Sequence, residues 1–375
     1  APPSGFLSLC SANLEEPTIG ANSLTQADDH FNSFLFTGDG GADKSLALNT
    51  FTPDWSWLKS RSGADNHVLI DSSRRNGANY PNLHSNEPDG EANDAFPKII
   101  TDGIITSEGL YNNNNVTFVV WNWKANGGTT VTNEDGSIDS TIQVNTDAGF
   151  SIITGTTSNV EANDMSETFG HGLSGTPDFV IIKSRSAAGI WLVWTSAIAI
   201  NNLQGLQFNT SGGLFTNSGY KTLQATSTLI QIGRQAVENN SKTFVCYAFK
   251  SVEGYSKFGS YIGNGVTTAT NSNGTFAFLG FRPAFIMIKN TTASAEWTMV
   301  DSVRSTFNEV DKILSAESTS DEDDFLYANR NIDFLSNGFK IRNTVAGGTT
   351  ALNTSGSVYI YMAFAEAPFK YANAR

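Results

Sequence analysis

The sequence contains few cysteines and few basic residues. Cys10 and Cys246 are the only two thiols in 375 residues, too few for a disulfide framework or for a zinc site built from cysteines. Lysine and arginine total 23 against 36 aspartates and glutamates, so the formal net charge is −13. Because nucleic acids and anionic lipid surfaces both attract clustered basic residues, this balance argues against either as a partner.

Long apolar runs are also missing. The longest covers residues 191–200 and contains Thr195 and Ser196, whereas a membrane-spanning helix needs roughly 20 apolar residues. We therefore expect no membrane insertion. The chain starts Ala1-Pro2-Pro3 with neither a methionine nor a signal-peptide pattern. We interpret this start as processed or as internal to a longer polypeptide.

What the sequence does contain is a repeated motif in which a proline opens a short apolar run that ends on a lysine. It occurs at residues 51–59, 175–183 and 281–289. Proline is tolerated where a strand begins, and a short continuous apolar run bounded by turn residues is typical of a strand buried on both faces. Each copy therefore predicts such a strand.

Further elements recur in the same order. An aromatic-rich segment follows each motif, at residues 117–124, 243–250 and 358–365, and a β-rich run ending in a glycine turn precedes it, at residues 32–40, 149–155 and 257–265. Asp102-Gly103 and Asn337-Gly338 beside apolar residues predict hairpins. Helical periodicity is nearly absent, and residues 310–316 are the best candidate for a short helix.

These patterns predict an all-β chain of three tandem β-sandwich-like domains, jelly-roll or lectin-like, with few short helices. With 39% hydrophobic residues, including 25 Phe and 7 Trp, there is ample material for packed cores. The expected organisation is a connector at 1–27, the first repeat at 28–127, a linker hairpin plus the second repeat at 128–254, and the third repeat at 255–375. Residues 127–136, rich in Gly, Thr and Asn, form the clearest linker.

Alignment of the repeats separates framework residues from candidate sites. Cys246 aligns with Val120 and Tyr361, so its position requires bulk rather than sulfur, and we interpret it as a core thiol. The aromatic stripe that includes Trp121 and Trp123 could form a sugar-stacking platform. Its period of two and its threefold recurrence fit a core better.

Polar groups give no catalytic pattern. Asp71-Ser72-Ser73-Arg74 recurs as Asp301-Ser302-Val303-Arg304, while the middle repeat has Thr195-Ser196-Ala197-Ile198. We interpret the Asp and Arg as a strand-end pair or an Asx-type turn, because no base is positioned to activate a nucleophile. No pair of carboxylates is singled out for glycoside hydrolysis.

No metal site is predicted from histidines. His30, His67, His84 and His171 lack the spacing of metal ligands and are expected in turns or at the surface, and the glycines around His171 indicate an unusual backbone. Acidic residues at 320–324 and 133–137 are expected in solvated loops, with a structural Ca²⁺ as the alternative. We assign no catalytic, metal or cofactor residue; the ligand-binding residues stay open, within the variable segments 73–101, 201–234 and 305–330.

The chain also resembles the C-terminal region of tail-fibre or tail-associated virion proteins of marine tailed bacteriophages. The segments that resemble these proteins are residues 6–14, 121–127, 170–173, 252–261, 333–340 and 359–375. The resemblance covers almost the whole chain and is most distinctive at the end, from Tyr359-Ile360-Tyr361 onward. Such proteins have no established catalytic residues, so none is transferred. One departure is the loss of the Asp–Arg pair in the second repeat.

Together these observations lead us to expect a structural protein on the virion surface, extracellular when assembled and not an enzyme. We expect a tail fibre or spike that contacts other virion proteins and attaches to a host cell-surface glycan or protein through loops on rigid strands. A homo-oligomer, a trimer by analogy with phage fibres, is expected. Two alternatives stay open: a non-adhesive component such as capsid decoration or a fibre shaft, and a tailspike glycan depolymerase.

Overall fold

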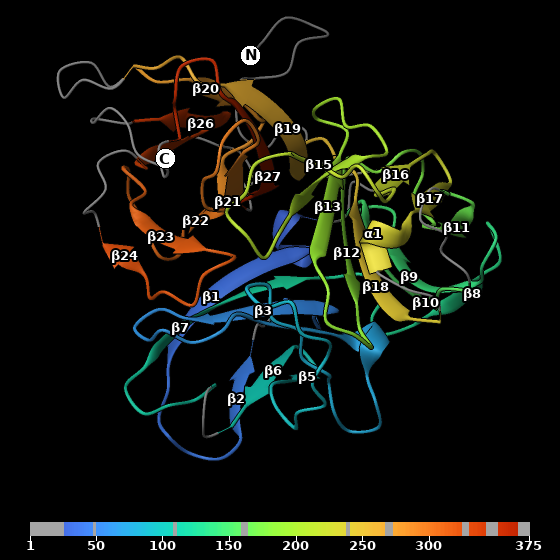
Figure 1. Ribbon diagram of the computed structural model, residues 1–375. Helices are drawn as coiled ribbons and strands as arrows, with labels where there is room; N and C mark the ends of the chain where they lie inside the picture. Colours follow the sequence, from blue (N-terminus) through green and yellow to red (C-terminus); the bar gives the residue numbers. More distant parts are fainter. Residues whose placement is uncertain are drawn as a thin grey trace, which may run out of the picture.

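The computed structural model describes residues 26–47, 50–107, 111–158, 164–237, 241–266, 273–324, 330–342 and 352–366. Most of the predicted connector (1–27) and the last nine residues of the resembling segment (359–375) lie outside these ranges. Nearly all regular structure in the described residues is antiparallel β-sheet (Figure 1). The prediction of an all-β, sandwich-like chain is confirmed. The described part includes no helix long and apolar enough to cross a membrane.

Each repeat contains one large sheet built around the strands that the sequence repeats predict. In spatial order, the first sheet consists of β1 (Phe31–Thr37), β7 (Thr117–Trp123), β3 (Trp55–Ser60) and β4 (Val68–Asp71). The second consists of β15 (Phe215–Thr216), β14 (Gln204–Gln207), β13 (Trp191–Thr195), β12 (Phe179–Ser184), β18 (Thr243–Phe249), β10 (Phe150–Thr156), β9 (Ser140–Asn145) and β8 (Val131–Asn133). The third consists of β19 (Ser256–Ile262), β27 (Val358–Ala365), β21 (Pro283–Asn290), β22 (Thr298–Asp301), β23 (Lys312–Ser315) and β24 (Asp323–Asp324).

Each repeat also has one three-stranded sheet. These are β2 (Lys44–Ala47), β6 (Gly103–Thr106) and β5 (Lys98–Ile100); β11 (Glu167–Gly170), β17 (Leu229–Ile232) and β16 (Leu223–Ala225); and β20 (Phe276–Phe278), β26 (Gly338–Ile341) and β25 (Ile332–Leu335). The helical pieces are η2 (Ala27–Asp29), η3 (Ser72–Arg74) and α1 (Arg234–Val237). The Asp102-Gly103 and Asn337-Gly338 hairpins predicted from sequence are confirmed as the β5–β6 and β25–β26 turns.

The aromatic-rich segments form the central strand of each large sheet. β7 pairs with β1 and β3, β18 with β10 and β12, and β27 with β19 and β21. Since every central strand has a neighbour on both edges and packed side chains on both faces, all its residues after the first are buried. This explains why these segments consist of almost uninterrupted apolar residues.

In repeats one and two, the two faces of the central strand belong to different cores, whereas both faces of β27 belong to the same cluster. In β18, Phe244, Cys246 and Ala248 pack inside the sandwich of repeat two, whereas Val245 and Tyr247 belong to a larger cluster. Cys246 is fully buried, and burial raises the pKa of its thiol well above the usual value. The prediction that it is a core thiol is confirmed.

The larger cluster combines residues of all three repeats. Trp55 of repeat one stacks on Tyr247 of repeat two with ring centroids 4.6 Å apart. Phe364 of repeat three lies 5.6 Å from Trp123 and 6.0 Å from Phe249, measured between ring centroids. Pairs of this kind contribute about 0.5–1.5 kcal/mol beyond their area burial. The aromatic stripe is therefore a shared core, as predicted for its burial, and the three repeats pack around it.

In the view of Figure 1, repeat one (blue to teal) takes the lower part, repeat two (green to yellow) the right, and repeat three (orange to red) the upper left. The strands of each repeat fall within 28–127, 128–254 and 255–375. The predicted linker at 127–136 contains strand β8, which pairs with β9, so it is partly built into the sheet of repeat two.

The helix expected at residues 310–316 is wrong. The segment contains strand β23, in which Leu314 lies opposite Met299 of β22. Ile313 and Leu314 are both buried. In a helix lying on the surface, two such consecutive residues would not both face the core. Pairing to the adjacent strand therefore overrides the weak helical propensity, and β14 pairs with β13 in the corresponding way in repeat two.

Candidate functional site

The Asp–Arg motif forms a buried ion pair in both repeats that contain it. The Asp71 carboxylate accepts from the Arg74 Nε at 2.5 Å and from its backbone N–H at 2.9 Å. Asp301 and Arg304 repeat this geometry at 2.6 and 2.8 Å. All four side chains are fully buried. The prediction of a strand-end pair with an Asx-type turn is confirmed.

Each of these aspartates also accepts a hydrogen bond from another repeat. The Tyr247 hydroxyl of repeat two donates to Asp71 of repeat one at 2.6 Å, and the Trp121 indole of repeat one donates to Asp301 of repeat three at 3.0 Å. Tyr247 and Trp121 occupy the same position in β18 and β7. Charge-assisted hydrogen bonds of this kind are among the stronger ones in proteins, so they join the repeats.

The remaining pairing, between repeats two and three, has neither the aspartate nor the hydrogen-bond donor. The equivalent of Trp121 and Tyr247 in β27 is Met362, which cannot donate a hydrogen bond. The equivalent of Asp71 and Asp301 in repeat two is Thr195, which instead donates to the backbone of Asp178. The missing aspartate of repeat two therefore coincides with the missing donor in repeat three. This accounts for the one departure that the sequence shows.

The lysine that ends each repeated motif reaches the neighbouring repeat in the same direction. The Nζ donors and carbonyl acceptors are Lys59 with Thr319 at 3.2 Å, Lys183 with Pro88 at 2.7 Å, and Lys289 with Ser211 at 2.9 Å. Repeat one thus contacts repeat three, three contacts two, and two contacts one, which closes a ring. Burial lowers the pKa of both Lys59 and Lys289 to about 8.

A second ring of contacts joins the same pairs of repeats. In each repeat the donor is the residue at, or just before, the start of β4, β13 or β22. Its bonds are His67 Nε2 to Ser315 O at 3.0 Å, Trp191 Nε1 to His84 O at 2.9 Å, and Trp297 Nε1 to Gln207 O at 3.0 Å. Nδ1 of His67 accepts from the Trp57 indole, so Nε2 is the nitrogen that donates. Burial keeps the pKa of His67 well below its usual value. This histidine is therefore a neutral counterpart of the two tryptophans.

The expectation that the histidines lie in turns or at the surface is wrong for His67 and His171, which are buried outside turns. His30 lies in the turn after η2, as expected, although it is buried. Composition gave no sign of this, because their burial depends on neighbouring segments that are distant in sequence. His171 accepts from the backbone N–H of Leu173, and Gly172 between them has a φ of +72°. The unusual backbone predicted there is confirmed. Within the described residues, no three His, Cys, Asp or Glu side chains are grouped to hold a metal ion.

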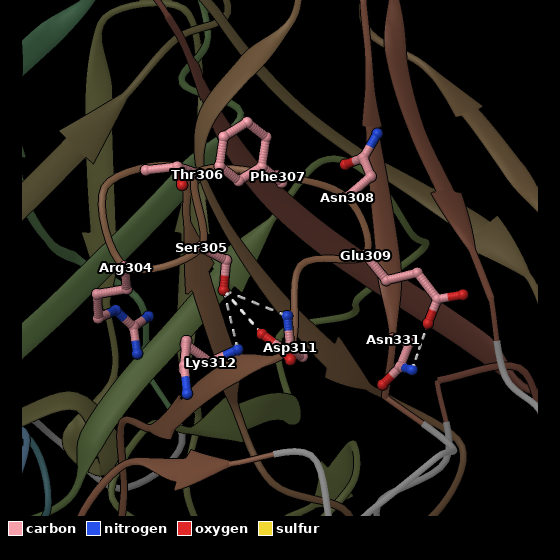
Figure 2. A pocket seen from close by; sticks show the side chains of 9 residues that line it. All are labelled: Arg304, Ser305, Thr306, Phe307, Asn308, Glu309, Asp311, Lys312 and Asn331. Atoms are coloured by element: carbon pink, nitrogen blue, oxygen red, sulfur yellow. Dashed lines mark hydrogen bonds between the residues drawn. The ribbon is translucent and has the colours of Figure 1, made fainter.

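Open space suited to a ligand lies instead on the loops. A cleft of about 470 Å³ in repeat three follows the Asp301–Arg304 turn (Figure 2). Its lining consists of Arg304, Ser305, Thr306, Phe307, Asn308, Glu309, Asp311, Lys312 and Asn331. Phe307 is 82% exposed, the highest value among the large hydrophobic residues that the structure describes. An exposed aromatic ring among amides and carboxylates is the feature that distinguishes this cleft.

The loop that presents Phe307 is held on both sides. The Ser305 hydroxyl donates to the Asp311 carboxylate at 3.1 Å and accepts from the backbone N–H groups of Asp311 and Lys312, as Figure 2 shows. The Asn308 side chain makes two hydrogen bonds to the backbone of Phe334, at 2.8 and 3.0 Å. These bonds fix residues on both sides of Phe307, so its exposed ring projects from a loop that is held in position.

A second cleft, of about 590 Å³, lies in repeat one. It is lined by Thr52, Pro53, Asp54, Ser72, Arg75, Ala78, Tyr80, Lys98, Ile99, Ile100, Thr101, Gly127 and Gly128. Asp54 is buried and accepts from the Ser72 hydroxyl and from the backbone N–H groups of Gly127 and Gly128. It therefore holds one wall of the cleft in place.

Both clefts involve the segment that follows a buried Asp–Arg turn. Most of their lining comes from residues 73–101 and 305–330, two of the variable segments in which the sequence left binding residues open. Sequence reasoning did not single out Phe307, Arg75 or Tyr80. The one available signal was that these residues have no fixed counterpart among the repeated framework positions.

The described residues form an all-β protein with three sandwich-like repeats around a common core and with loop-lined clefts in repeats one and three. The chain belongs to the family described as a domain of unknown function, DUF7483, whose model matches residues 26–368. No curated protein and no solved structure matches the chain.

Proposed function

We propose that this chain is a structural protein on the surface of a bacteriophage virion, a tail fibre or spike, that attaches to a host-surface glycan through the cleft in repeat three. The phage assignment is supported by the sequence resemblance stated above. The assignment of attachment is supported by the loops, because binding residues are commonly displayed on loops held by a rigid scaffold. Its other partners are virion proteins, and a trimer is expected by analogy with phage fibres alone.

The observation that supports glycan binding most strongly is the exposure of Phe307. A large apolar ring that is 82% exposed forgoes the stabilisation that burial would provide, so a ligand that covers it gains apolar contact. The C–H face of a sugar ring can stack on an aromatic face, while amide and carboxylate groups bind its hydroxyls. Asn308, Glu309 and Asn331 supply such groups in the same cleft.

The test is a binding and adsorption experiment with the purified full chain. The wild-type protein is expected to bind host-surface polysaccharide and to block phage adsorption, and Phe307→Ala is expected to lower the affinity at least about tenfold, or 1.4 kcal/mol. Phe276→Ala is the matched control, because Phe276 is also an exposed phenylalanine of repeat three but lies outside the cleft. Equal binding by Phe307→Ala and wild type, or no binding and no block by the wild type, would overturn the proposal.

A glycan depolymerase is the second candidate, favoured by the two carboxylates that line the cleft beside Phe307. Glu309 accepts from the Asn331 amide at 2.5 Å, and Asp311 accepts from Ser305. Hydrolysis of a glycosidic bond uses a pair of carboxylates. Release of reducing ends from the bound polysaccharide, lost in Glu309→Gln while binding persists, would select this candidate. Binding without release would select attachment alone.

A further inference from the structure

The cleft of repeat one differs from the rest of the molecule in its charge. The chain is strongly acidic, with 36 acidic and 23 basic residues, yet two cations line this cleft, Arg75 and Lys98. In the described residues, neither has a carboxylate partner within the 4.0 Å that defines an ion pair. A cation without a partner in an acidic protein is available to a ligand.

Arg75 is held in place with most of its hydrogen-bonding capacity unused. Its Nε donates to the carbonyl of Gly77 at 2.9 Å, and its guanidinium carbon lies 5.7 Å from the centre of the Tyr80 ring. These two contacts orient the guanidinium. Its terminal nitrogens donate to none of the residues that the structure describes. An arginine in this condition can bind an anion with two parallel hydrogen bonds.

Lys98 and Tyr80 add to the same lining. The Lys98 ammonium lies 4.4 Å from the centre of the Phe96 ring, a contact that positions the charge without neutralising it. The Tyr80 side chain is largely buried, and its hydroxyl has no hydrogen-bond partner in the described part of the chain. The cleft therefore offers two cations, a phenol and the hydroxyl of Thr101, whereas the Thr52 hydroxyl is already hydrogen-bonded to Asp102.

The acidic residue of the cleft does not neutralise these cations by direct contact. The Asp54 carboxylate is fully buried and accepts from the backbone N–H groups of Ala125, Gly127 and Gly128 as well as from the Ser72 hydroxyl. These four donors occupy its oxygens, so Asp54 shapes the wall of the cleft.

Most other arginines are already paired. The arginines in ion pairs with aspartate or glutamate are Arg61, Arg74, Arg185, Arg282, Arg304, Arg330 and Arg342. Arg234 provides a useful contrast, since it also lies over a tyrosine, Tyr220, at 5.2 Å from the ring centre. It does not line the repeat-one cleft, and it therefore serves as a matched control.

We propose that the repeat-one cleft binds the anionic group of an acidic saccharide, with Arg75 and Lys98 holding the anion and Tyr80 and Thr101 hydrogen-bonding the sugar. The proposal rests on the glycan-binding function proposed above and assigns it a second site with its own ligand chemistry. Carboxylate and sulfate groups both satisfy the two cations, so the test includes both.

The experiment is calorimetric titration of the full chain with three probes: an oligogalacturonate, a sulfated oligosaccharide and neutral maltohexaose. The anionic probes, or one of them, are expected to bind, with affinity falling as NaCl rises, and the neutral probe is expected not to bind this cleft. Arg75→Ala and Lys98→Ala should each weaken binding at least tenfold. Arg234→Ala, which removes an equivalent Arg–Tyr contact elsewhere, should leave it unchanged.

The outcomes separate this proposal from the proposed function. If the wild type blocks phage adsorption but binds neither anionic probe, the anion site is wrong and attachment through Phe307 stands. If the Arg75→Ala, Lys98→Ala double variant remains folded and still binds the anionic probes as tightly as wild type, the site is also wrong. Binding of an anionic probe that is lost in this double variant but kept in Phe307→Ala supports two separate sites. Loss in Phe307→Ala alone contradicts it.

Discussion

The junctions between the repeats differ in chemistry although their backbones match. At two junctions a glutamate N–H donates to an arginine carbonyl, Glu91 to Arg185 at 2.8 Å and Glu322 to Arg61 at 2.7 Å, and the same two residues form ion pairs. Between repeats three and two the same backbone bond joins Leu214 to Thr291 at 2.8 Å, and because neither residue is charged we call this junction uncharged. The Lys289 ammonium also crosses it, to the carbonyl of Ser211. The backbone thus fixes the geometry, and the side chains vary within it.

The comparison shows that the buried aspartate, its arginine and the aromatic donor are either all present at a junction or all absent from it. The charged junctions contain an aspartate, its arginine, and an aromatic donor from the neighbouring repeat; the uncharged junction has Thr195 and Met362 in those places. A buried aspartate without its partners would be strongly unfavourable. A donor without an acceptor would also cost stability, because a buried polar group needs a hydrogen bond.

The largest expected effect comes from breaking one charged junction. Asp71→Asn removes the nearer of the two carboxylates paired with the fully buried Arg74 and leaves only Glu91, at 3.4 Å. It should lower the free energy of unfolding by about 3–5 kcal/mol. The matched change in the uncharged position, Thr195→Val, removes two neutral hydrogen bonds, one donated to the Asp178 carbonyl and one accepted from the Ala197 N–H. It should cost about 1–2 kcal/mol. Urea unfolding measures both. Equal losses would show that the charged junction has no special role.

A smaller effect is expected from the donor alone. Tyr247→Phe keeps the ring and removes the hydroxyl that donates to Asp71, so we expect a loss of about 1.5–3 kcal/mol. Met362→Leu, at the equivalent position of repeat three, changes only shape and should cost under about 1.5 kcal/mol. Comparison of the two unfolding midpoints checks this. A larger loss for Met362→Leu would contradict the distinction between the junctions.

A pH-dependent difference is expected at Glu317. Three equivalent side chains accept from a backbone N–H: Asn86 from His67, Asn209 from Trp191, and Glu317 from Trp297. Burial raises the pKa of Glu317 to about 7 from an ordinary value of 4.5. The folded state therefore holds the proton more tightly than the unfolded state, and the stability that this provides is lost as pH rises from about 4.5 to about 7.

Glu317→Asn, which installs the residue of the other two repeats, should remove this pH dependence. We expect the variant to be more stable than wild type by about 1–2 kcal/mol at pH 8 and to differ little near pH 4. Asn209→Asp is the reverse control and should create a similar decline with pH in repeat two. Thermal unfolding across this range is the measurement, and a wild-type stability that rises from pH 4.5 to 7 relative to Glu317→Asn would refute it.

The smallest expected effect concerns the rim of a charged junction. Arg185 and Glu91 are each about one-fifth exposed, so Arg185→Gln should cost only about 0.5–1 kcal/mol. The loss should shrink in 1 M NaCl, because salt screens partly exposed charges. Unfolding at low and high salt tests this, and a loss independent of salt would point to packing instead.

The sequence was sufficient to predict the strands that repeat. Cys246 and the stripe containing Trp121 occupy positions that recur as bulk with a period of two, and such a pattern has one stable placement, between sheets. The Asp71–Arg74 pair was predictable because its two partners are three residues apart. The helix expected at 310–316 failed because pairing to β22 outweighed a local propensity.

Contacts between repeats could not be predicted from the sequence in the same way. Which repeat receives Lys59, or which aspartate receives Trp121, depends on the direction in which the ring closes. That direction follows from packing in three dimensions, and no local pattern encodes it. The clefts could not be located from the sequence for a similar reason. Arg75 and Lys98 are separated along the chain and line the same cleft only once the chain is folded.

The central claim is that the three repeats fold around one shared core. Differential scanning calorimetry of residues 26–368 tests it most directly, by comparing the calorimetric enthalpy with the van't Hoff enthalpy. We predict one transition with a ratio near one, which Asp71→Asn shifts as a whole to lower temperature. Separate transitions, of which Asp71→Asn moves only one, would contradict the shared core.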